Sequence, residues 1–122
     1  MSQTAIEEEY SVDVKLLAQQ NDAFRAVFPA PQNAGRWLHT QSVAAMGPTF
    51  VMKAYAAIGS YDDFNTDIDP YGDHAMGKFT IDGETVWFKI DCYDVDYHYG
   101  SDQPDNPEMT RRVLTIMLSR DL

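Results

Sequence analysis

Hydrophobic residues recur at helical spacing in two stretches of the chain. The first stripe consists of Val12, Leu16, Leu17, Phe24, Val27 and Phe28. The second consists of Phe50, Ala54, Ile58, Tyr61 and Phe64. Because apolar side chains three and four residues apart face one side of an α-helix, these stripes predict helices over 12–28 and 49–63. The polar face of the first helix, with Asn21 and Asp22, is expected to be solvated.

Strand-like alternation of hydrophobic and polar residues marks three other stretches. Residues 36–40 carry a short alternating pattern, and residues 76–81 and 84–93 flank Asp82-Gly83. An Asp-Gly pair suits the two central positions of a tight hairpin turn, which both need a positive φ, so a β-hairpin is predicted here. The face of its second arm that is predicted to enter the core carries Val86, Phe88, Ile90 and Cys92. A short turn is expected over residues 42–46.

The C-terminal part is ambiguous in two places. Residues 95–101 alternate as a strand does, yet they are polar enough to form a loop, and both interpretations remain open. Asn106 and Pro107 suit the N-cap and first position of a helix, so residues 108–118 are predicted to be helical. A strand remains the alternative for this segment, because its β-branched residues favour strands.

Together these elements predict an α+β fold, with a small antiparallel sheet around the central hairpin, residues 76–93, packed against two or three helices. A chain of 122 residues suffices for a single domain over 1–122, with 1–10 as a frayed start. No basic and apolar leader and no apolar run of about 20 residues is present, so neither secretion nor a membrane span is expected. The single cysteine, Cys92, excludes an intramolecular disulfide and fits the cytoplasm.

Charge changes this picture because it is unevenly spread. The chain has 19 acids, 9 Lys and Arg, and a net charge of −10. Twelve of the acids but only two bases, Lys78 and Lys89, lie between Asp62 and Asp105, so this span alone carries the whole net charge. Binding to phosphates needs Lys and Arg, so direct nucleic-acid binding is not expected. Basic protein surfaces, or cations, are the expected partners.

Tyrosines accompany these acids, and the combination suits binding to a basic protein groove. Charge steers the approach of a partner, while aromatic side chains supply buried contact area. The predicted partner-binding residues are Asp67, Asp69, Tyr71, Asp73, Asp94, Asp96, Tyr97 and Tyr99. The plainer interpretation is that the acids aid solubility and the aromatics belong to the core. No cofactor is predicted.

A second hypothesis is a small metal- or His-assisted hydrolase with its site at Asp73, His74 and Asp91. Asp69, Asp73 and His74 supply ligand types for a divalent ion, although their spacing is not that of an EF-hand. Alternatively, His74 pairs with Asp91 or Asp94 as a general base, but no pattern identifies a nucleophile. A structural interpretation competes with both, in which a His–Asp hydrogen bond only fixes the loop onto the sheet.

Three blocks of the sequence resemble a family of small bacterial domains of unknown function. The pattern of that family is roughly Asn-Asp-Pro-Tyr-Gly-Glu-His-Asp-Phe-Gly, then Trp-x-Lys-Ile-Asp-Tyr-Tyr-Asp, then Arg-Val-Leu-Thr-Ile-Met-Leu. The corresponding blocks here are 68–77, 87–94 and 112–118, and residues 21–25 also resemble the first-helix segment of that family. Ile68 stands where the family has Asn, and Ala75 where it has Asp, so part of any chemistry carried by those polar residues is absent from this member.

The resemblance implies a shared architecture and no known activity. Such domains are often carried on plasmids and other mobile elements, and this association suits an inhibitor of a host defence. We therefore expect a nucleic-acid-mimicking protein of the anti-restriction or anti-CRISPR type that binds a protein with a basic surface. The sequence leaves the oligomeric state open.

Overall fold

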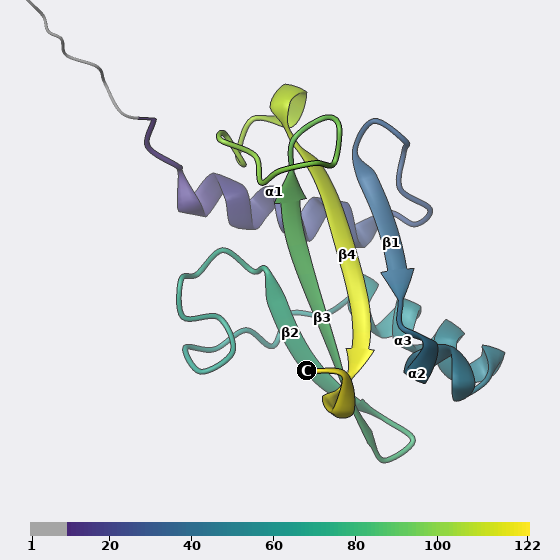
Figure 1. The fold of residues 1–122 in the computed structure, drawn as a ribbon. Helices are drawn as coiled ribbons and strands as arrows, with labels where there is room; N and C mark the ends of the chain where they lie inside the picture. Colours follow the sequence, from purple (N-terminus) through teal and green to yellow (C-terminus); the bar gives the residue numbers. More distant parts are fainter. Residues whose placement is uncertain (1–9) are drawn as a thin grey trace, which may run out of the picture.

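The computed structural model describes residues 10–122, so the first nine residues of the predicted frayed start lie outside the described part. Its elements are α1 (Val14–Ala26), β1 (Gly35–His39), α2 (Gln41–Ala45), α3 (Pro48–Gly59), β2 (Met76–Ile81), β3 (Glu84–Tyr93) and β4 (Arg111–Leu118). Two 3₁₀ turns span Pro107–Met109 and Ser119–Asp121. Helices pack on one face of a four-stranded sheet, so the predicted α+β class is confirmed (Figure 1).

The sheet has the strand order β1-β4-β3-β2 and is mixed. The predicted hairpin is present, with β2 and β3 antiparallel and β3 antiparallel to β4. β1 instead runs parallel to β4, with Gly35 opposite Arg112. A Cβ atom at Gly35, where φ is +152°, would lie 1.9 Å from the carbonyl oxygen of Arg112. Only glycine allows the two backbones to approach this closely.

The predicted closing helix over 108–118 is wrong, because this segment forms β4 after a single 3₁₀ turn. Asn106 does cap that turn, since its side chain accepts a hydrogen bond from the backbone N–H of Glu108. The alternating residues of β4 that point into the core are Arg112, Leu114, Ile116 and Leu118. Burial between two strands outweighs the local cap, and the strand alternative was the correct one. Residues 95–101 form a loop, with one isolated bridge between Tyr93 and Gly100.

The predicted helix boundaries also shift. α1 begins after Asp13, whose side chain accepts a hydrogen bond from the backbone N–H of Leu16, and it ends at Ala26. α3 ends at Gly59, so Tyr61 and Phe64 pack against the core from the following loop and not from the helix. Residues 42–45 of the expected turn belong to α2, and Met46 is its C-cap. These differences leave the order of the predicted elements intact up to the C-terminal segment.

The core lies between the helices and one face of the sheet. Its buried side chains include Phe50, Ile58, Val86, Phe88, Leu114 and Ile116. The opposite face of the sheet is not covered by a helix (Figure 1). Four basic residues occupy strand positions that alternate onto this open face. They are Arg36, Lys78, Lys89 and Arg111. Within residues 10–122, no helix has the length and apolar character needed to cross a membrane.

Candidate functional site

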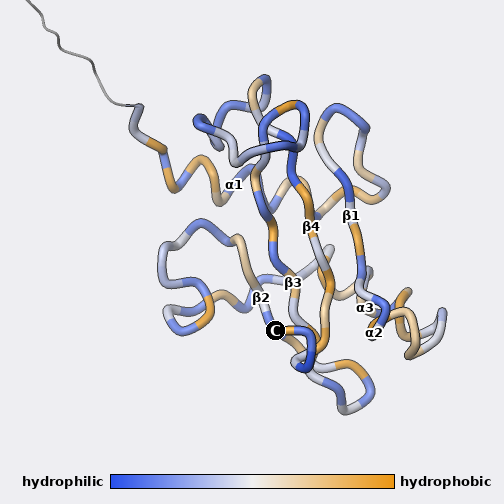
Figure 2. Tube along the Cα trace, in the orientation of Figure 1, coloured by the Kyte–Doolittle hydropathy of each residue, from blue (hydrophilic) through white to orange (hydrophobic). Residues whose placement is uncertain are grey.

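Nearly all of the net charge lies in two loops. The 60–75 loop joins α3 to β2 and contains five aspartates, and the 94–106 loop follows β3 and contains four. Neither loop contains a Lys or an Arg. Both are predominantly hydrophilic in the hydropathy colouring of Figure 2. The two loops therefore carry nine uncompensated aspartates by sequence.

Both loops are attached to neighbouring residues of α1. The side-chain amide of Asn21 donates to the backbone carbonyl of Asp73 at 2.8 Å, which fixes the 60–75 loop. That of Gln20 donates to the carbonyl of Asp105 at 2.8 Å, which fixes the 94–106 loop. The guanidinium of Arg112, buried in β4, donates to Asn21 at 2.7 Å and to Gln20 at 3.1 Å. One network thus holds the two acidic loops in a defined relation.

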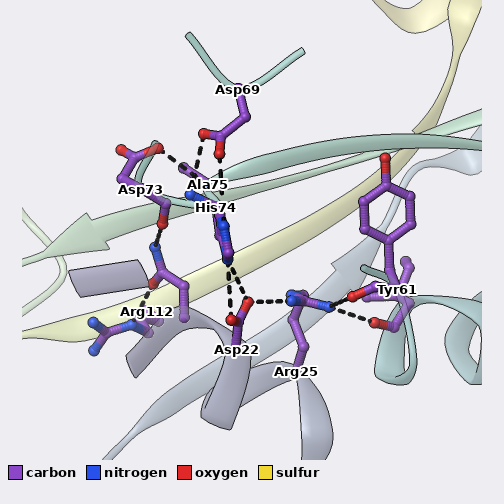
Figure 3. Close-up of polar contacts among 10 residues, drawn as sticks. Asp22, Arg25, Tyr61, Asp69, Asp73, His74, Ala75 and Arg112 are labelled. Carbon is purple, nitrogen blue, oxygen red and sulfur yellow. Dashed lines mark hydrogen bonds and ion pairs between the residues drawn. The ribbon is translucent and has the colours of Figure 1, made fainter. Parts of the chain in front are cut away.

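His74 fixes the shape of the 60–75 loop. Its backbone, at φ 58°, donates to the carboxylate of Asp69 at 3.1 Å. Its imidazole Nδ1 lies 2.9 and 3.0 Å from the two carboxylate oxygens of Asp22 on α1. The ring stacks on Phe64, with centroids 3.9 Å apart and an interplanar angle of 2°. These contacts dock the loop on α1 (Figure 3).

Asp22 continues this network to the end of α3. Its carboxylate also pairs with the buried guanidinium of Arg25. Arg25 in turn donates to the carbonyl oxygens of Ile58 at 3.0 Å and Tyr61 at 2.9 Å, where α3 ends (Figure 3). The expectation of a solvated helix face is therefore wrong for Asn21, which is 1% exposed. The side chain of Asp22 is 43% exposed, yet it also bridges a histidine and an arginine.

The 94–106 loop is shaped by its own aspartates. The Asp94 carboxylate accepts hydrogen bonds from the backbone N–H groups of Asp96, His98 and Tyr99. These hydrogen bonds, led by that of His98, lower the pKa of Asp94. At the far end of the loop, the Asp105 carboxylate accepts from the backbone N–H of Asp13 at 2.9 Å. Aspartate carboxylates thus fix both ends of the loop, one on the backbone of the loop itself and the other on the backbone of Asp13.

The eight predicted partner-binding residues separate into two groups. Asp67, Tyr71, Asp96 and Tyr99 are exposed, with Tyr71 and Tyr99 at 81% and 76% of their full accessibility. The other four shape the loops: Asp69 and Asp94 accept backbone hydrogen bonds, Asp73 is half-buried, and Tyr97 lies under the Arg36 guanidinium at 3.9 Å. Of the eight residues, Asp67, Tyr71, Asp96 and Tyr99 therefore form the exposed surface of the loops. It also includes the exposed loop residues Asp62, Asp63 and Asp102.

The pairs proposed for a hydrolase are not brought together. His74 contacts Asp22 and lies 3.8 Å from Asp69, whereas Asp91 pairs with Lys89 at 3.1 Å and Asp94 caps its own loop. Burial raises the pKa of the Cys92 thiol, which keeps it protonated and a poor nucleophile. No group of three His, Cys, Asp or Glu side chains within residues 10–122 is arranged to hold a metal ion, so Asp69, Asp73 and His74 do not form a cluster of that kind.

The organising role of these residues was not predicted, although Asn21, Asp22 and Arg112 lie in segments that resemble the family. Gln20, Asn21 and Asp22 are consecutive on α1. Arg112 donates to Gln20 and Asn21 across more than 90 positions of the chain, whereas Asp22 bonds His74 and Arg25. The sequence held one weak signal for Arg112. A basic residue at an inward position of a strand needs a polar partner in the core, because burying an unpaired charge is costly. Recognising β4 as a strand would have placed Arg112 at such a position.

Comparison with known protein families finds a match for most of the chain. A family model described as a protein of unknown function (DUF3768) matches residues 39–121. This range contains both acidic loops, His74 and Arg112, whereas α1 precedes it. No curated protein and no solved structure matches the chain.

Proposed function

Because this chain belongs to DUF3768, a family of proteins of unknown function, we propose its role from its own surface. The protein is a non-enzymatic interaction domain whose two acidic loops bind a basic site on a partner protein. The observation that carries this proposal is the gathering of nine aspartates, without one Lys or Arg, in two loops attached to neighbouring residues of α1.

Electrostatics gives this surface its expected behaviour. The described ion pairs of the chain use Asp22, Asp82 and Asp91 opposite Lys or Arg, and none of these lies in either loop. The exposed loop carboxylates are therefore uncompensated locally, and their field steers a basic partner toward the loops. Tyr71 and Tyr99 supply large side chains with few rotatable bonds for the contact itself.

Fixed loops lower the entropy that is lost on binding. Intramolecular hydrogen bonds stabilise the conformation of the loops. They are formed by the polar groups of Asp69, His74 and Asp94. Exposed residues between these anchors are consequently presented by a backbone that is already ordered. A partner then gains contacts without having to order the loops first.

The partner class that we propose is a protein whose basic site is built to hold nucleic acid. A protein surface rich in carboxylates is negatively charged, as the phosphates of nucleic acid are, so the same basic site attracts both. Acting as a nucleic-acid mimic, the domain would block a restriction or CRISPR-type complex. This is the role expected of a defence inhibitor, and it makes competition with DNA a direct test.

The experiment compares three versions of the tagged full-length chain as bait in a lysate of the cells that carry its gene. Asp67→Lys with Asp96→Lys reverses one exposed acid in each loop. The matched control, Ala44→Lys, Ala45→Lys, Met52→Lys and Ala56→Lys, changes the net charge by the same amount at exposed positions of α2 and α3, outside both loops. Captured proteins are identified by mass spectrometry, and binding is then measured with each purified partner.

We expect a partner that binds the wild type and the control but loses at least about tenfold in affinity for the loop variant. Binding should also weaken steeply between about 50 and 300 mM salt, because exposed charges are screened over roughly 8–10 Å. Duplex DNA should compete with the wild-type chain. Equal binding of all three versions, or binding indifferent to salt, would overturn the proposed function. Binding that DNA does not displace would overturn the proposal of a nucleic-acid mimic.

A further inference from the structure

A second surface feature has a lining that includes no residue of either acidic loop. A groove of about 650 Å³ runs between α1, the segment before β1 and the start of β4. Its apolar wall consists of Ala23, Phe24, Val27, Ala30, Pro31 and Ala34. Its volume falls in the range of small-molecule sites, which are mostly apolar with a few placed polar groups.

Two arginines line the polar end of this groove. Arg111 lies at the rim, where its Nη1 donates to the backbone carbonyl of Thr110 at 3.0 Å. Arg112 is only 6% exposed and donates through Nε and Nη2 to uncharged oxygens of Asn21, Gln20 and Pro104. No carboxylate of the described residues forms an ion pair with either arginine.

Arg112 is therefore a buried cation whose partners in residues 10–122 are all neutral. Taking a charged group out of water is costly unless an opposite charge compensates it, and burial accordingly lowers the pKa of this arginine. The other polar side chains at this end are already engaged: Gln20 donates to Asp105, and the Thr110 hydroxyl donates to the carbonyl of Gln103. Glu108, also on the groove, is exposed and pairs with neither arginine.

We propose that this groove is a binding site for a small organic carboxylate with an apolar tail. The tail packs along Ala23, Val27 and Ala30, and the carboxylate meets the guanidinium of Arg112, while Arg111 adds positive charge at the rim. A guanidinium suits this role because it offers parallel N–H donors to the two oxygens of a carboxylate. This proposal does not rest on the proposed function, since the groove takes an anion and the acidic loops take a basic partner.

The test is a titration of the full-length chain with octanoate, followed by amide chemical shifts in NMR spectra. Octanol and octylamine serve as comparison ligands, because they keep the chain length and replace the anion by a neutral or a cationic group. Ala23→Trp fills the groove from an exposed helix position, and Ala26→Trp places the same side chain on α1 outside the groove as the matched control. Arg111→Gln removes the rim cation while leaving Arg112 in its network.

Octanoate is expected to shift the amides of residues 23–34 and 110–112 and to bind about tenfold more tightly than octanol, the effect of one charge-assisted hydrogen bond. Arg111→Gln should weaken octanoate severalfold without changing octanol, and Ala23→Trp but not Ala26→Trp should abolish both. Equal affinity for octanoate and octanol would show an apolar contact surface only and would overturn the proposal. Shifts confined to other residues, or unchanged by Ala23→Trp, would overturn it as well.

Discussion

Asn21→Ala tests the network on which the arrangement of both loops depends. Asn21 is 1% exposed and makes two side-chain hydrogen bonds, one to the carbonyl of Asp73 and one from the guanidinium of Arg112. Removing it leaves Arg112 with Gln20 at 3.1 Å and the carbonyl of Pro104 at 3.5 Å, both longer than the 2.7 Å bond to Asn21. The substitution therefore removes the shortest hydrogen bond of the buried Arg112 guanidinium. It also removes the hydrogen bond that fixes Asp73 in the 60–75 loop.

The size of the effect follows from the two bonds. A hydrogen bond to a charged group contributes about 1.5–3 kcal/mol, and one between neutral groups contributes about 0.5–1.5 kcal/mol. The free energy of unfolding should therefore fall by about 2–4.5 kcal/mol, a large part of the roughly 5–15 kcal/mol that is typical of a domain. Asn21→Asp should recover part of this loss, because a carboxylate still accepts from Arg112. It cannot donate to Asp73, so the loop stays released.

Urea denaturation measures the change in the free energy of unfolding, provided that the m-value stays the same. Amide hydrogen exchange shows which residues lose protection. In both variants the amides of Asp73 to Ala75 should exchange faster than in the wild type. Gln19→Ala is the control, since Gln19 is exposed on the same helix and its loss should change stability by less than about 0.5 kcal/mol. A loss below about 1 kcal/mol for Asn21→Ala, with unchanged loop exchange, would refute the network as the loops' anchor.

Two further predictions concern the sheet and the titration of the loop. Gly35→Ala should destabilise the fold by about 4 kcal/mol or more in thermal unfolding, because its Cβ collides with the Arg112 backbone, whereas Gly100→Ala, with no atom within 4 Å of the added Cβ, should not. Asp73→Asn should raise the melting temperature at pH 7, because burial raises the pKa of Asp73 and folding then favours the protonated form. That gain should vanish as the pH falls toward the ordinary Asp range near about 3.9, and a gain that persists there would contradict this cause.

Features set by neighbouring residues were predictable from the sequence. Both arms of the hairpin have the predicted bounds, since Asp82 and Gly83 adopt φ values of 51° and 83° as the turn requires. Val86, Phe88 and Ile90 all enter the core, because side chains alternate between the faces of a strand. At these positions the local preference and the tertiary environment agree.

Features set by distant residues were not predictable in this way. Asn106 and Pro107 start a helical turn as their local chemistry dictates, yet β1 and β3 on either side convert residues 111–118 into a central strand. The same limit applies to the candidate site. His74 was paired with Asp91 or Asp94, which are near in sequence, whereas its partner Asp22 lies 52 positions away on a helix face that looked solvated.

The position of His74 in this fold bears on where the activity of the domain resides. Asp69, Asp73 and His74 belong to the block that carries the family resemblance, and all three face inward toward backbone N–H groups, α1 or Phe64. A histidine that is hydrogen-bonded to Asp22 and stacked on a ring is constrained in a way that favours an ordered loop over proton transfer to a substrate. The exposed residues between these anchors, Asp67 and Tyr71, have no such structural duty in the described contacts and are free to contact a partner. Within the 60–75 loop, the inward residues therefore set the fold, and the outward ones are where binding would be expected.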